Sequence, residues 1–323
     1  MAEEQRGGRP LDEYLQQIHT ASRRLGDVRT QMARVLVGQK SLVDRLLIGL
    51  LCDGHLLLEG APGLAKTTAV KALARSLHAR FSRIQFTPDL LPMDITGTNI
   101  FDLRQKAFTF QPGPIFTNLL LADELNRATP KTQSALLEVM AEGQVTVEGV
   151  THKMEPPFLC IATMNPLDHD GTYALPAAQL DRFTMQLSMG FPGPEAEMNM
   201  LDVHLGQQAP VDTLQPVIDK KTFLGWQALV TKIFISEEIK RYLVTLANTI
   251  RADPRALAPP SPRSLLMLAR VSQAHAMAKG RDYVIPEDVR ALAPEVLAHR
   301  MVISGDEVGL AYVQSIMEKV PLR

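Results

Sequence analysis

The sequence predicts an α/β protein with a five-stranded, mostly parallel sheet and a small all-helical domain after it. Short apolar runs alternate with helical patterns over residues 11–192, which is typical of parallel strands connected by helices. Phe191-Pro192-Gly193-Pro194 then interrupts the chain, because proline and glycine terminate regular structure. Residues 193–323 show helical patterns and no convincing strand. We expect a disordered polar start at residues 1–10, a core of residues 11–192 and a lid of residues 193–323.

The composition limits the classes of protein to which this chain can belong. With 323 residues, the chain is long enough for two domains. Its formal net charge is −1, so no overall positive field indicates nucleic-acid binding. The charged first residues do not resemble a signal peptide, and the longest apolar runs are too short to span a bilayer. Cys52 and Cys160 both lie in apolar runs, which favours buried free thiols. These features predict a cytoplasmic protein without a membrane segment.

Two helices are expected before the first strand. Apolar residues recur at helical spacing over residues 11–36, and we expect Gly26 to interrupt this leading helix. A short connection, Val37-Gly38-Gln39, precedes a second helix over about residues 40–52. Composition alone describes this connection as a turn between two helices.

The stretch from His55 to Thr68 reads as an apolar strand, a small-residue loop and the start of a helix. Such a loop offers a polyphosphate converging backbone N–H groups, a lysine charge and a hydroxyl that completes a Mg²⁺ shell. The predicted nucleotide-binding residues are Gly60, Ala61, Pro62, Gly63, Leu64, Ala65, Lys66, Thr67 and Thr68. Ala65 replaces the second glycine of the general motif, and we expect it to adopt an ordinary negative φ at the start of the helix.

A second motif also predicts a polyphosphate ligand with Mg²⁺. Residues 119–122 form an apolar strand that ends abruptly in Asp123 and Glu124. In α/β proteins ligands bind where the carboxyl ends of the strands emerge. Asp123 is therefore expected to hold Mg²⁺ through water, together with Thr67, and Glu124 to polarise the attacking water.

Further strands and two hairpins are expected around this pair. Residues 157–166 read as a buried strand that ends in a polar residue, Asn165. Asn165 at the strand tip could hydrogen-bond the γ-phosphate or the attacking water, and the alternative is an asparagine that only caps the loop. Residues 83–86 and 184–189 complete the five strands. Two hairpins are also predicted, one over residues 98–110 with its turn at 102–106, and one over residues 144–154 with its turn at 148–151. Both are candidate partner-binding elements, and decoration of the sheet edge explains them nearly as well.

The lid is expected to contain several capped helices. Ser236 caps a helix with one apolar face, and Ser261-Pro262 begins another that ends near Gly280. Pro286 begins a further helix.

These motifs resemble the MoxR family of AAA+ ATPases over nearly the whole chain after about Leu36. The resemblance rests on seven segments: Gly-Ala-Pro-Gly-Leu-Ala-Lys-Thr (60–67), Phe-Thr-Pro-Asp-Leu-Leu-Pro-Met-Asp-Ile-Thr-Gly (86–97), residues 113–128, residues 131–140, Ala-Thr-Met-Asn-Pro (162–166), Leu-Asp-Arg-Phe (180–183) and Ser-Pro-Arg-Ser (261–264). The alanine before Lys66 fits this family's own loop. The two hairpins resemble those of the helix-2-insert branch, to which magnesium-chelatase motor subunits also belong.

The resemblance implies roles for further residues. It places Val37-Gly38-Gln39 against the nucleotide base and makes Arg182 the arginine finger that reaches a neighbouring subunit's nucleotide. Arg127, three residues after Glu124, is the alternative finger. Arg263 matches the family's sensor-2 arginine, and its position in the first turn of a helix also disfavours a cation unless an anion is near. Whether Arg263 acts in its own or in the neighbouring subunit stays open.

The leading hypothesis is a ring-forming, Mg²⁺-dependent ATPase, hexameric by family resemblance, that remodels or activates a protein client. The resemblance further implies a partner with a von Willebrand factor A domain. One alternative is a magnesium-chelatase-type motor subunit. Another is a nucleotide-gated binding module with negligible turnover, although Glu124, Asn165, Arg182 and Arg263 together exceed what binding alone requires. The client, the size of the oligomer and the role of the hairpins are not visible in the sequence.

Overall fold

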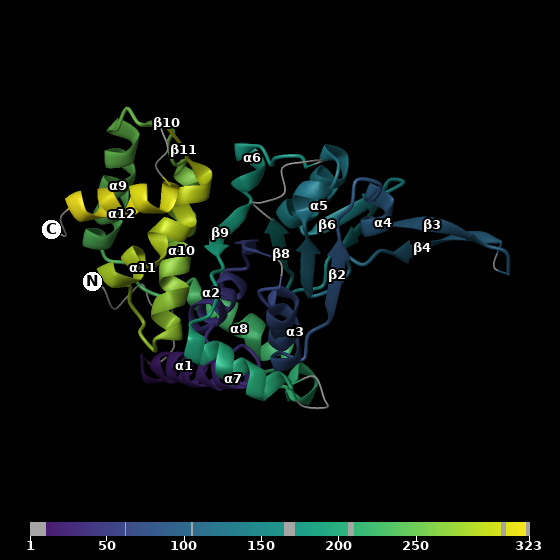
Figure 1. Ribbon diagram of the computed structural model, residues 1–323, viewed down its shortest axis with the longest axis horizontal. Helices are drawn as coiled ribbons and strands as arrows, with labels where there is room; N and C mark the ends of the chain where they lie inside the picture. Colours follow the sequence, from purple (N-terminus) through teal and green to yellow (C-terminus); the bar gives the residue numbers. More distant parts are fainter. Residues whose placement is uncertain are drawn as a thin grey trace.

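The computed structural model describes residues 11–61, 63–104, 106–164, 172–205, 210–304 and 308–320. A five-stranded sheet with helices on both faces is followed by a group of helices that packs beside it (Figure 1). The expected disorder of residues 1–10 concerns residues outside the described ranges. Among the residues described, no helix combines the length and apolar character that a membrane crossing requires.

The central sheet has the strand order β2-β5-β8-β1-β9, and every neighbouring pair is parallel. Its strands are β1 (His55–Glu59), β2 (Phe81–Gln85), β5 (Leu119–Asp123), β8 (Leu159–Met164) and β9 (Phe183–Ser188). The predicted five-stranded parallel sheet is therefore confirmed. Because parallel strands run in one direction, their carboxyl ends all emerge at the same edge of the sheet.

Helices cover the sheet on both faces, which explains why its inner strands β1, β5 and β8 are almost continuously apolar. Alternate residues of one strand enter different cores: Leu56 and Leu58 pack with one apolar cluster, and Leu57 packs with the other. The first cluster includes α1 (Leu11–Ala33), α2 (Lys40–Leu51) and α3 (Lys66–Ser76). The second includes α4 (Pro92–Thr96) and α5 (Pro130–Glu142). The leading helix is continuous, so the expected interruption at Gly26 is wrong, since packing of its buried face outweighs the weak helix propensity of one glycine.

Both predicted hairpins are present. They consist of β3 (Gly97–Asp102) with β4 (Ala107–Pro112), and of β6 (Gln144–Val147) with β7 (Val150–Lys153). The sequence predicts the turn of the second hairpin over residues 148–151. The observed turn is shorter than that, since β7 already begins at Val150. The β3–β4 hairpin projects from the body of the molecule (Figure 1). At its base the rings of Phe110 and His152 stack with centroids 3.8 Å apart, so the two hairpins pack against each other.

The remaining helices form the lid and its connection to the core. They are α6 (Ala177–Leu180), α7 (Pro194–His204), α8 (Lys220–Val230), α9 (Glu237–Ala252), α10 (Pro262–Ala278), α11 (Pro286–Leu297) and α12 (Gly309–Lys319), with 3₁₀ turns at Pro210–Thr213 and Ala298–Arg300. A further 3₁₀ turn, Leu125–Arg127, follows β5 in the core. The expected caps are present: the Ser236 hydroxyl accepts a hydrogen bond from the Ile239 N–H, and Ser261 caps α10 in the same way.

One expectation about the lid is wrong. Two very short strands, β10 (Ala256–Ala258) and β11 (Val302–Ile303), pair antiparallel within it. Segments of three and two residues are too short to show a period in the sequence, and their pairing depends on distant parts of the chain. The apolar cluster on one sheet face continues into α10 and α11 without interruption. The division at residue 193 therefore stays a prediction.

A buried histidine connects the sheet to α5. His55 accepts a hydrogen bond from the Cys160 N–H at Nδ1 (3.0 Å) and donates one from Nε2 to the Met140 carbonyl (2.9 Å). This arrangement requires a neutral ring, and burial lowers the pKa of His55 from 6.5 to about 4.

We expect the free energy of unfolding to fall as the pH drops from about 6.5 toward 4. In this interval the unfolded chain binds a proton at His55 that the folded protein excludes, so acid favours unfolding. A shift from 6.5 to about 4 corresponds to about 3 kcal/mol at most. Urea unfolding followed by Trp226 fluorescence between pH 4.5 and 7.5 measures this dependence. His55→Gln keeps a donor for Met140 but takes up no proton, so its pH slope should be smaller. Equal slopes in both proteins would contradict the assignment.

Candidate active site

The small-residue loop lies between β1 and α3, as the strand–loop–helix pattern predicts. Together with the ends of neighbouring strands it forms an open pocket of about 340 Å³. Its described lining residues are Gly63, Ala65, Lys66, Thr67, Thr68, Arg83, Asp123, Glu124 and Thr163. The structure thus brings the two predicted motifs, the loop and the acidic pair, into one site. Pro62 lies outside the described residues.

The backbone at Ala65 differs from our expectation. Its φ is +58° and its ψ is 25°, which is the left-handed conformation and not the expected negative φ. Gly63 is also left-handed, with a φ of +88°. Ala65 is the N-cap of α3, where the chain must turn sharply from the loop into the helix. Left-handed residues in such turns aim successive N–H groups at one point and form an anion-binding concavity. For alanine this conformation costs about 1–2 kcal/mol.

Lys66 is half-buried at the first position of α3, with its ammonium near the acidic pair. Burial lowers the pKa of Lys66, whereas Asp123, Glu124 and Glu59 favour its charged form. The Nζ atom donates a hydrogen bond to the Gly60 carbonyl at 2.5 Å, which closes the loop on itself. A polyphosphate in this pocket would offer this donor a charged acceptor in place of a neutral carbonyl.

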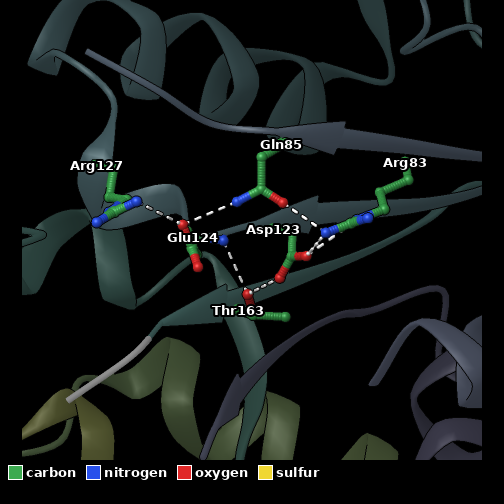
Figure 2. A network of polar contacts seen from close by, with 6 residues as sticks. All are labelled: Arg83, Gln85, Asp123, Glu124, Arg127 and Thr163. Atoms are coloured by element: carbon green, nitrogen blue, oxygen red, sulfur yellow. Dashed lines mark hydrogen bonds and ion pairs between the residues drawn. The ribbon is translucent and has the colours of Figure 1, made fainter. Parts of the chain in front are cut away.

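Thr163 links the two carboxylate residues (Figure 2). Its hydroxyl donates to Asp123 Oδ1 at 2.6 Å and accepts from the Glu124 N–H at 2.9 Å. Asp123 ends β5, and Thr163 lies on the adjacent strand β8. Glu124 follows with a φ of +58°, an uncommon conformation for a residue other than glycine. The hydrogen bond from its N–H to Thr163 helps to hold this strained turn.

Two side chains of the edge strand β2 complete the network (Figure 2). Arg83 donates to Asp123 Oδ2 from Nε (3.0 Å) and from Nη2 (2.6 Å). Gln85 accepts from Arg83 Nη2 at 2.6 Å and donates to Glu124 Oε2 at 2.8 Å. Arg127 also pairs with Glu124 Oε2, at 3.2 Å. Glu124 is thus held by two side chains of its own chain.

Sequence reasoning missed three residues of this network: Arg83, Gln85 and Thr163. A signal was present for the first two, since they are polar residues at alternate positions of a strand and therefore share one face. Assigning them to the site additionally requires the knowledge that β2 pairs with β5, with Gln85 directly opposite Asp123.

The residues of the pocket fit a magnesium ion. Thr67 and Asp123 both line it, and they supply the hydroxyl and carboxylate oxygens that Mg²⁺ prefers. The pairing of Asp123 Oδ2 with the Arg83 guanidinium indicates that this oxygen is oriented to receive a cation.

The connection Val37-Gly38-Gln39 lies next to the segment that follows β9. Gly38 has a φ of +77°, and a side chain there would collide with Ala196 and crowd Pro192. None of these three residues lines the pocket as the described residues define it. Their contact with a base, and the role of Asn165, which lies outside the described residues, stay predictions.

Arg182 and Arg263 lie at a different corner of the molecule from the loop. Arg263 Nε is 3.9 Å from Asp181 Oδ2, at the junction of α6 and β9, and its side chain is 54% exposed. The buried Arg300 pairs with the same carboxylate at 3.1 Å and also donates to the Phe183 carbonyl. The lid therefore brings Arg263 beside Arg182, and neither arginine is among the described residues that line the pocket.

A phosphate-binding loop, a strand that ends in Asp123-Glu124 and an associated helical lid define the class of AAA+ ATPases. The family model "ATPase family associated with various cellular activities (AAA)" matches residues 55–185, and the model "AAA lid domain" matches residues 249–319. The chain belongs to the MoxR family of AAA+ ATPases. It is 42% identical over 300 residues to Chaperone MoxR1 of Mycobacterium tuberculosis, covering 90% of this chain and 78% of that protein.

Other relatives extend over nearly the whole chain. The uncharacterized protein YeaC of Bacillus subtilis is 45% identical over 290 residues, which are 90% of this chain and 89% of YeaC. A crystal structure of a Cytophaga hutchinsonii protein, described as a candidate ATPase, superposes with a TM-score of 0.91 at 36% identity and covers 98% of this chain and 100% of that one. The chain is accordingly an ATPase, and the pocket is the candidate for its nucleotide site.

We expect Thr163→Val to reduce the rate of ATP hydrolysis about tenfold while ATP affinity changes little. The variant keeps the shape of threonine but removes the hydroxyl that orients Asp123 and supports the Glu124 turn, and one such hydrogen bond is worth about 1–1.5 kcal/mol. Steady-state kinetics and calorimetry separate the two effects. Thr163→Ser, which keeps the hydroxyl, is the control and should stay active. Equal rates in the valine and serine variants would show that the hydroxyl is dispensable.

Proposed function

We propose that this protein hydrolyses Mg²⁺-bound ATP within a ring of identical subunits, most simply a hexamer, and uses the cycle to remodel protein clients in the cytoplasm. The observation that carries the proposal is the division of the site. Lys66, Asp123 and Glu124 meet in one pocket, whereas Arg182 and Arg263 lie together at another corner. Phosphoryl transfer requires extra positive charge in its transition state, and we infer that a neighbouring subunit supplies it.

Within one subunit each residue of the pocket has a distinct task. Lys66 neutralises the outer phosphates, and the left-handed loop residues Gly63 and Ala65 shape the backbone that receives them. Thr67 and Asp123 would hold Mg²⁺, which neutralises charge on the phosphates when bound. Glu124 orients and activates the attacking water, and Asn165 is proposed to hydrogen-bond the γ-phosphate.

Arg182 is the better candidate for the finger. Arg127 already pairs with Glu124 of its own chain at 3.2 Å, which gives it a local role beside the acidic residue. Arg263 lies next to the Arg182 corner, and we propose that both arginines approach the nucleotide of the neighbouring subunit. Leu266 follows Arg263 by one helical turn and is 73% exposed, so it supplies apolar surface at the same corner.

A protein client is supported by the family and by an exposed apolar surface. The relative in Mycobacterium tuberculosis is named a chaperone. At the end of the projecting hairpin, Phe101, Leu103 and Phe108 are between 47% and 81% exposed. We propose that this hairpin contacts clients and that a protein with a von Willebrand factor A domain is among the partners. Membership in the MoxR family favours this function over that of a magnesium-chelatase motor subunit.

Glu124→Gln should bind ATP normally but hydrolyse it at least about a hundredfold more slowly, because the amide keeps the shape but cannot act as a base. Calorimetry and phosphate release measure the two properties. Since this variant keeps ATP bound, a true client should associate with it in ATP and dissociate in ADP. Equal losses of binding and turnover would make Glu124 a structural residue.

Mixing Glu124→Gln with Arg182→Ala should restore part of the lost ATPase activity. Each variant alone is inactive, but a Glu124→Gln subunit still offers Arg182 to a neighbour that has an intact Glu124. The recovered rate should fall on dilution, since assembly follows mass action. The same mixture with Arg127→Ala shows whether that arginine acts across the boundary. Absence of recovery in subunits shown to exchange would exclude a finger role of Arg182 in a neighbouring site.

A further inference from the structure

Arg83 reaches the active site because of the register of the sheet. It lies on the edge strand β2, which pairs in parallel with β5. Gln85 is directly opposite Asp123 in this pairing, and Arg83 precedes Gln85 by two residues. Residues two apart on a strand point to the same face, so both side chains extend toward the acidic pair.

Arg83 and Thr163 together occupy both oxygens of Asp123. Thr163 donates to Oδ1, and Arg83 donates twice to Oδ2. The Asp123 side chain is 15% exposed and that of Arg83 is 46% exposed, so the ion pair lies at the mouth of the pocket. The hydrogen bond from Arg83 Nη2 to Gln85 Oε1 holds the guanidinium in this orientation. The contact with Gln85 therefore fixes the position of Arg83 beside Asp123, whereas an isolated surface arginine would have no such second contact.

The same carboxylate is the one that would hold Mg²⁺ through water. A guanidinium and a hydrated dication at one carboxylate oxygen repel each other, so binding of one opposes binding of the other. In the absence of metal, Arg83 compensates the charge of Asp123 in a pocket that Glu124 also lines. Binding of the metal requires that this compensation be given up.

We propose that Arg83 is a positioning residue that occupies Asp123 in the nucleotide-free site and yields Oδ2 to Mg²⁺ when the metal arrives with the nucleotide. The inference rests on the proposed Mg²⁺-dependent ATPase. The arginine keeps Asp123 in its binding orientation and raises the Mg²⁺ concentration at which the site fills. Mg²⁺ is thereby bound together with the phosphates. Their negative charge attracts the metal and so compensates for the loss of the Arg83–Asp123 ion pair.

The chain offers a matched control for this residue. Arg80 immediately precedes β2 and pairs with Glu155 at 2.5 Å. Its side chain is 59% exposed, comparable with Arg83, but Arg80 is not among the described residues that line the pocket. Arg80→Gln therefore removes a similar surface ion pair without changing the charge at Asp123.

The experiment measures ADP affinity of the full-length protein by calorimetry, first in EDTA and then at increasing Mg²⁺ concentration. Arg83→Gln should lower the Mg²⁺ concentration for half-maximal gain in affinity by about two- to fivefold, the range expected for loss of a partly exposed ion pair. Arg83→Lys keeps the charge but loses the two-donor geometry, so its value should lie between those of Arg83→Gln and the unaltered protein. Arg80→Gln should leave it unchanged. Thermal unfolding checks that each variant is folded.

Other outcomes would overturn the inference. An unchanged half-maximal Mg²⁺ concentration in folded Arg83→Gln would show that Arg83 does not compete with the metal. Equal weakening of ADP binding with and without Mg²⁺ would make Arg83 a phosphate ligand instead. If the unaltered protein hydrolysed ATP equally fast in EDTA and in Mg²⁺, the proposed Mg²⁺-dependent function would itself fail. That last result is measured on the unaltered protein alone. It can therefore be distinguished from a failure of the inference about Arg83, which is measured on the variants.

Discussion

The parallel pairing of β1, β5 and β8 is the constraint on which the rest of this site depends. Each strand is buried on both faces, so its apolar residues determine how the strands stack and leave the polar residues to emerge at one edge. Asp123 ends β5 and meets Thr163, which lies near the end of the adjacent strand β8. Lys66 lies at the start of α3, the helix that follows β1. A slip of one residue in β5 would turn Asp123 to the opposite face and separate it from Thr163.

Two turns with an uncommon backbone conformation lie where this edge meets the candidate site. Ala65 and Glu124 both adopt left-handed conformations, with a φ of +58° in each. Neither residue is a glycine, so each conformation is unfavourable by itself and has to be held by its surroundings. The helix that begins at Lys66 holds the first, and the hydrogen bond from the Glu124 N–H to Thr163 holds the second. Strain and chemical function thus coincide in the same two turns.

Charge distribution within the pocket is the physical basis for proposing that a second subunit contributes to the site. Within the pocket Lys66 and Arg83 face Asp123 and Glu124, so the groups of the chain nearly balance before a nucleotide is present. A triphosphate adds several negative charges, which a metal ion and further arginines would compensate. The lid carries Arg263 to the corner of Arg182 and away from its own loop, which is the arrangement expected if these charges serve a neighbouring site. Apolar packing between lid and core fixes this placement, because the first apolar cluster runs through both.

The sequence by itself determined the fold class, the nucleotide-binding loop and the acidic pair, because each depends on residues that are contiguous in the chain. The conformation of each motif follows from neighbouring residues. One motif is a run of apolar residues that ends in Asp123-Glu124, and the other is a strand followed by a small-residue loop and Lys66-Thr67. Only the tertiary structure decided that Arg83, Gln85 and Thr163 belong to the site, since their roles depend on which strands are neighbours. It also decided the left-handed turn at Ala65, the pairing of β10 with β11 and the position of Arg263. Apart from the turn at Ala65, which is local to the loop, these features arise from contacts between residues far apart in the chain, whose energies no local pattern contains.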